Sequence, residues 1–98
     1  MNNIFKSNVG DIIEVPKTGV ISIGTRSHSQ ITINLETNLG SFMREGEIKS
    51  ELFQLVKISS PIVIGSPVEL WVTTSENSNR VGVIKTSPVS HTRVVTLP

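Results

Sequence analysis

The chain has 98 residues, enough for one small domain over residues 1–98 and too few for a second hydrophobic core. Twelve Val, twelve Ile and nine Thr, with no Ala and six Leu, favour strands and exclude a helix bundle or a coiled coil. The absence of Cys excludes a disulfide scaffold and zinc–thiolate sites, and the net charge of +1 excludes a strongly basic nucleic-acid-binding protein.

Short segments of alternating hydrophobicity, separated by Gly and Pro turns, predict strands along the chain. In chain order they are 11–15, 19–24, 30–36, 52–58, 62–64, 68–74, 80–86 and 92–97. The segment 30–36 has the clearest alternation, because its three apolar side chains share one face. Residues 37–46 are predicted to be irregular, because two glycines interrupt them.

The stretch 47–58 is compatible with two structures. Its apolar residues fall at helical spacing, yet the same residues also alternate as on a strand. The all-β composition favours a strand over 52–58, while 47–51 is left open as a helical turn.

Seven or eight short strands at spacings of about 8–12 residues are typical of a β-sandwich or a barrel. The predicted fold is therefore all-β, a single small sandwich or barrel of jelly-roll or immunoglobulin-like type.

Catalytic chemistry has little support in the sequence. Asp11 is the one Asp, and the two His are His28 and His91, each preceded by a Ser. Neighbouring residues on a strand point to opposite faces, so neither Ser–His pair is expected to act as nucleophile and base. A triad would need His28 or His91 to meet a Ser and a carboxylate across the fold. The chain is predicted to be no enzyme.

Cofactor, metal, membrane and nucleic-acid sites are not expected either. The sequence has no phosphate-binding glycine motif and no closely spaced group of metal ligands. Its longest apolar runs are three residues, such as 62–64, which argues against a membrane span. The nine basic residues are scattered singly, which argues against nucleic acid as a partner.

Two predicted strands carry apolar residues on both faces. In the segment 52–58, Phe53 and Leu55 are expected on one face of the strand, and Leu52 and Val56 on the other. In the segment 68–74, Trp71 is expected on the face opposite to that of its two apolar neighbours. A sheet covered on one side should show polar residues on the other. We therefore predict that Phe53, Leu55 and Trp71 are interface anchors in a homo-oligomer, with packing inside one chain as the alternative.

The chain resembles small β-sandwich domains of tailed-phage virion proteins in one part of its sequence. The resemblance lies in residues 52–58, residues 67–74 and Arg80. In those domains a strand of the form F-x-L-x-x-I precedes one of the form V-x-L-Y-x-T and a loop that ends in Arg; here Trp71 stands at the Tyr position. The resemblance implies a structural virion protein, such as a capsid decoration, head-fibre or tail component. Its partner would be a capsid or tail subunit, and it would be made in the host cytoplasm.

The alternative function is a monomeric recognition module that binds glycan, peptide or single-stranded nucleic acid at its loop tips. Loops on a rigid β scaffold are the usual place for recognition. The candidate tip residues are Arg26, His28, Asn77 and Arg80.

Overall fold

The computed structural model describes residues 2–76 and 78–96, and these residues form strands, turns and loops with no helix among them. The predicted all-β sandwich class is confirmed. The strands are β1 (Asn2–Lys6), β2 (Ile12–Ile13), β3 (Val20–Thr25), β4 (Gln30–Asn34), β5 (Leu39–Met43), β6 (Glu51–Ile58), β7 (Ile62–Val63), β8 (Glu69–Thr73), β9 (Gly82–Lys85) and β10 (Val89–Thr96).

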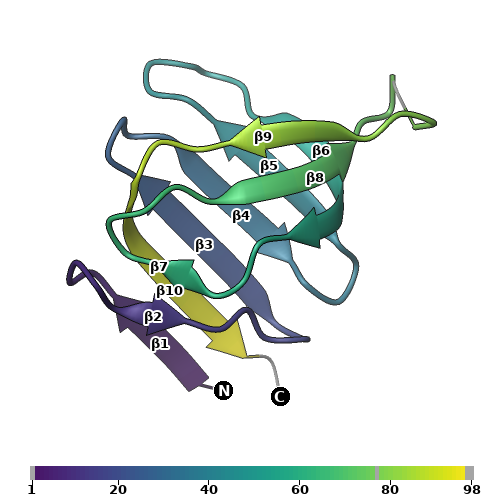
Figure 1. Ribbon diagram of the computed structural model, residues 1–98. Coiled ribbons are helices and arrows are strands. Elements are labelled where there is room, and N and C mark those ends of the chain that lie inside the picture. The colour runs from purple at the N-terminus through teal and green to yellow at the C-terminus, as the bar shows by residue number, and fades with distance from the viewer. Residues whose placement is uncertain (1, 77, 97–98) are drawn as a thin grey trace.

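Eight strands form one antiparallel sheet in the order β1-β10-β3-β4-β5-β6-β8-β9, and β2 pairs with β7 in a second, two-stranded sheet. The large sheet folds over itself at β6, so that β8 and β9 cross in front of the strands behind them (Figure 1). A bulge between Leu55 and Lys57 interrupts the pairing of β6 with β8. Such bulges let one strand serve two layers.

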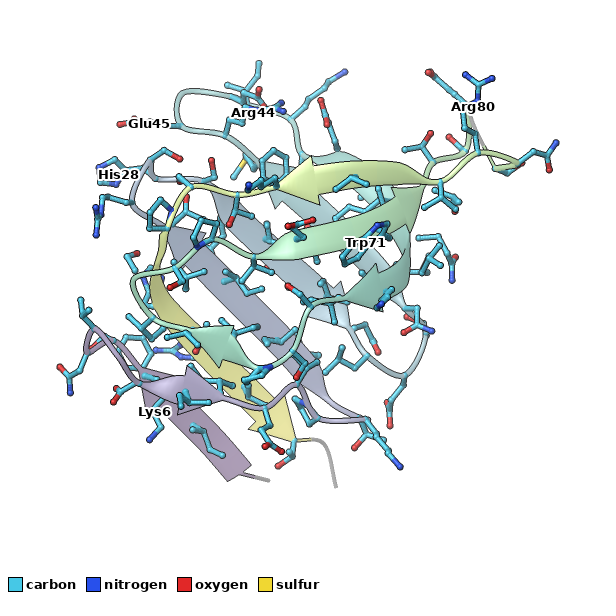
Figure 2. The ribbon with its side chains drawn as sticks, viewed as in Figure 1. Lys6, His28, Arg44, Glu45, Trp71 and Arg80 are labelled. Atoms are coloured by element: carbon cyan, nitrogen blue, oxygen red, sulfur yellow. The ribbon has the colours of Figure 1, made fainter. Side chains whose placement is uncertain are left out.

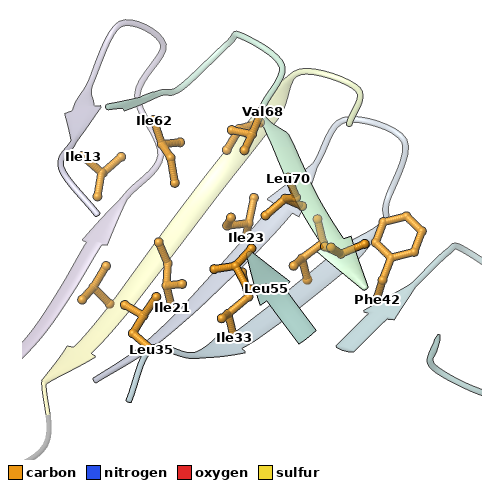
Figure 3. Packing of buried hydrophobic residues seen from close by; sticks show 14 of the residues in the cluster. Ile13, Ile21, Ile23, Ile33, Leu35, Phe42, Leu55, Ile62, Val68 and Leu70 are labelled. Carbon is orange, nitrogen blue, oxygen red and sulfur yellow. The ribbon is translucent and has the colours of Figure 1, made fainter. Parts of the chain in front are cut away.

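The core lies between these layers (Figure 3). Its rear side is built from Ile21 and Ile23 of β3 and from Ile31 and Ile33 of β4, all fully buried. Leu70 of β8 packs onto them from the front, and the β2–β7 pair covers the remaining part. Branched side chains suit this core because they fill the space above a pleated sheet with little loss of rotamer freedom.

Each of the eight predicted segments overlaps a strand, and the structure adds two more strands, β1 and β5. The expectation of an irregular 37–46 segment is wrong, because residues Leu39–Met43 form β5. Gly40 is paired with Phe53 of β6, and a Cβ at Gly40 would collide with the Phe53 ring. The aromatic ring thus covers the glycine and keeps it in a strand, so the glycine is not a breaker here.

The other added strand, β1, pairs with β10 at the edge of the sheet. The ambiguous stretch is resolved in favour of the strand, since β6 covers Glu51–Ile58. Residues 44–50 make a loop that begins with a turn in which the Glu47 amide donates to the Arg44 carbonyl. Leu97, placed in the last predicted strand, lies outside the described residues.

Candidate interaction surfaces

The structure reverses the expected faces of β6. Phe53 and Leu55 are only 5% and 8% exposed and belong to the core, whereas Leu52 is 74% exposed. The expectation that Phe53 and Leu55 face outward as anchors is therefore wrong. The physical reason is Gly40, which leaves an inner space that the Phe53 ring fills and so fixes which face of β6 points inward.

Trp71 does lie on the outer face of β8, opposite the buried Leu70 and Val72, and its ring is half-buried. The Lys57 ammonium lies 5.2 Å from the ring centroid, which is a cation–π distance. Trp71 is also directly opposite Val83 on β9, so the indole is next to the edge of the sheet.

An uncharged hollow lies on the outside of β5 and β6. Leu39 and Leu52, both exposed, line it together with Gln54 and Thr73. Leu39 faces Gln54 across the strand pair, so Leu39 and Leu52 are diagonal neighbours on one face. The sequence pattern pointed to Leu52 but assigned it to the inner face, and it gave no strand at all around Leu39.

The large sheet has two open edges, because β1 and β9 are the ends of the strand order. Ile4 and Phe5 are exposed on β1, and Val83 is exposed on β9, with Val81 just before it. Unpaired apolar edges are sites where other chains add a strand.

The predicted loop-tip residues do not form one site. Arg26 and His28 are exposed in the β3–β4 turn, where the His28 backbone has a positive φ of 64°. Arg80 lies at the opposite end of the molecule, before β9 (Figure 2). Asn77 lies outside the described residues. A ligand at the loop tips would therefore contact the β3–β4 turn or the segment around Arg80, but not both.

The Ser90–His91 pair differs from the expectation for strand neighbours. A bulge between Val89 and His91 leaves Ser90 as an extra residue opposite Gly24. Both side chains then lie together, with Ser90 Oγ 3.1 Å from His91 Nδ1. The premise that these two neighbours point to opposite faces is thus wrong, because the alternation of faces fails at a bulge.

The surroundings of this pair nevertheless give Ser90 little support as a nucleophile. Ser90 Oγ lies 3.2 Å from the Gly24 carbonyl oxygen, which competes with His91 Nδ1 for the single hydroxyl proton. The hollow around them is also lined by Arg26, His28 and Gln30, and no carboxylate of the described residues lines it. A third group that would orient the imidazole as a base is missing from this lining.

We expect that a fluorophosphonate reagent, which labels activated serines, leaves Ser90 unmodified. The reason is that no carboxylate of the described residues lines the hollow to orient His91 as a base, while the Gly24 carbonyl competes for the Ser90 proton. Mass spectrometry of the treated protein and of a Ser90→Ala control measures this directly. Stoichiometric labelling of the wild type and not of Ser90→Ala would contradict the non-enzymatic reading.

Comparison with known proteins gives no relative. No family model matches the chain, and no curated protein or solved structure matches it either. Within the described residues, no group of three or more His, Asp or Glu side chains could hold a metal ion. The described part of the chain also contains no helix that is long and apolar enough to cross a membrane.

Proposed function

We propose that the chain is a non-enzymatic structural subunit that works by self-association and by docking to a larger assembly. The setting implied by the sequence resemblance is a virion, with a capsid or tail subunit as the larger partner. The observation that carries the proposal is the uncharged hollow of Leu39 and Leu52 on the outside of β5 and β6.

The chemistry of this hollow supports contact with a second copy. Among the described residues its lining has apolar side chains, hydroxyls and an amide, and no charged residue. In a two-fold contact the same patch meets itself, so a charged patch would bring like charges together. A patch without charge avoids that cost, and two leucines per copy supply apolar area for burial.

A monomeric recognition module is the second candidate. The observation in its favour is that exposed cations lie at both loop ends, Arg26 at one and Arg80 at the other. Because these ends are far apart, each would bind a ligand by itself, without the convergence that tight recognition usually needs.

The test is the solution mass by light scattering over a dilution series of wild type and Leu52→Lys. We expect wild type to form an oligomer that dissociates on dilution, and Leu52→Lys to weaken it about a hundredfold, because about 3 kcal/mol of leucine burial is lost. Leu52 is exposed in the single chain, so its replacement should leave the fold intact.

The matched control is Ile48→Lys, which makes the same change in charge at a side chain that is 96% exposed in the 44–50 loop, outside the hollow. We expect the dissociation constant of the Ile48→Lys oligomer to equal that of wild type. A wild type that is monomeric at every concentration would contradict self-association and favour the recognition module.

A further inference from the structure

The outer edge of β9 borders a groove. One wall is the strand and its continuation, from Val83 to Ser87, and Phe42 and Arg44 at the end of β5 form part of the other. The hydroxyls of Ser27 and Ser87, 2.7 Å apart, join the two walls at one end. Figure 1 shows β9 as the free margin of the front layer, with the β5–β6 loop beside it.

Hydrogen bonding fixes which backbone groups of β9 remain open. The Thr86 amide donates to the Val68 carbonyl at 3.0 Å, so Thr86 and Val68 are a hydrogen-bonded pair. Along the antiparallel pairing of β8 and β9, hydrogen-bonded pairs alternate with pairs that are not hydrogen-bonded. By this alternation Ile84 turns its amide and carbonyl toward β8, while Val83 and Lys85 turn theirs toward the groove. No backbone group of the described residues pairs with them.

The cation that β9 contributes to the groove is Lys85, which lies on the strand and forms no ion pair with a carboxylate of the described residues. Glu69 is the cross-strand neighbour of Lys85, yet no ion pair joins them. The far wall carries Arg44 and Glu45, and Arg44 is already paired with Glu47 and Glu51.

A second copy of β9 fits this edge poorly. The strand has the sequence Gly-Val-Ile-Lys, so a second copy brings another Lys85 and no carboxylate to the edge. Like charges close to each other across a strand pair are destabilising. An extended segment with acidic side chains at alternate positions avoids this repulsion and places a carboxylate beside Lys85.

We propose that β9 accepts an extended acidic peptide segment of a partner protein as an added strand of the sheet. Main-chain hydrogen bonds to Val83 and Lys85 would supply affinity, and the Lys85 ammonium would select acidic side chains. This inference deepens the docking half of the proposed function and rests on it, but it does not need self-association.

The test uses a blocked seven-residue peptide of alternating Glu and Val, with a Lys and Val peptide as its control. Trp71 is the one Trp of a chain without Tyr, and it lies opposite Val83, so its emission reports on the edge. We expect saturable binding of the Glu peptide with a Kd below about 1 mM and binding of the Lys peptide at least about tenfold weaker. Amide shifts in NMR spectra should centre on Val83 and Lys85.

Two variants of Val83 separate the backbone from the side chain. Val83→Pro removes the amide that faces the groove and keeps the ladder to β8, so the Glu peptide should bind about tenfold more weakly. Val83→Thr keeps both the amide and the branched shape, so it should bind like wild type. Equal binding by all three proteins would overturn strand addition.

A third variant covers the case in which the proline chain does not fold. Lys85→Glu should bind the Glu peptide more weakly than wild type does and the Lys peptide more tightly. Unchanged preference, or shifts centred away from β9, would overturn the inference.

The outcome is separable from that of the proposed function. Leu52→Lys should bind the Glu peptide like wild type, because the hollow is not part of the groove. A monomeric wild type that binds the peptide supports this inference while it contradicts self-association. An oligomeric wild type that does not bind overturns this inference alone.

Discussion

Replacing Leu70 with Ala is expected to lower the free energy of unfolding by about 3–4 kcal/mol. Leu70 is fully buried at the point where β8 crosses the rear strands, and it packs against the isoleucines of β3 and β4 (Figure 3). Deleting its branch leaves a cavity that the neighbouring strands cannot close, because their hydrogen-bonded ladders hold them in place. Urea unfolding followed by Trp71 emission measures the loss.

The matched control is Leu52→Ala, the same chemical change on the outer face of β6. Leu52 is mostly exposed, so its truncation should cost less than about 1 kcal/mol. Both variants should be compared under conditions in which the protein is monomeric. The free energy of unfolding of Leu52→Ala then contains no contribution from association. Equal losses would show that β6 has the opposite face inward from the one described.

The second large effect is expected at Gly19, where Ala should lower the free energy of unfolding by about 3 kcal/mol. The backbone there has a φ of 97°, and a Cβ would collide with the backbone carbonyl of Val95 on β10. The Gly19 carbonyl also accepts from the Leu35 amide at 2.8 Å, so the residue cannot move away without losing that bond. Both the strained φ and the collision oppose the new methyl group.

Gly10→Ala separates these two causes. Gly10 has a similar φ of 94°, but no heavy atom lies within 4 Å of the Cβ position. We expect its replacement to cost about 1 kcal/mol, which is the conformational part alone. If both glycine variants lose the same stability in urea, then the contact with β10 has no energetic weight, and the placement of Gly19 against that strand is wrong.

Much of the strand pattern could be predicted from the sequence, because alternation is a local property of a half-buried strand. The segments around β3, β4, β6 and β8 each have it. β5 could not be predicted, because the Phe53 ring that covers its glycine comes from a residue thirteen positions later in the chain. β1 was missed because a short edge strand carries exposed apolar side chains and so shows no alternation.

The candidate surfaces were less predictable than the strands. Trp71 was correctly placed on an outer face, because both of its neighbours are strongly apolar. Phe53 and Leu55 were placed on the wrong face, because β6 has apolar residues on both sides and local sequence has no means of choosing between them. The Ser90–His91 contact depends on a bulge, which is set by pairing with β3.

Composition and local pattern are enough to establish that this chain is an all-β protein rich in β-branched residues, with strands where hydrophobicity alternates. That follows from composition and period, which act within a few residues. The folded chain alone shows which face of β6 is buried, which strands remain open at the edges, and that Lys85 borders the groove at β9. These features depend on contacts between segments far apart in the chain, and the packing of Phe53 over Gly40 selects one of two faces that the local sequence leaves equal.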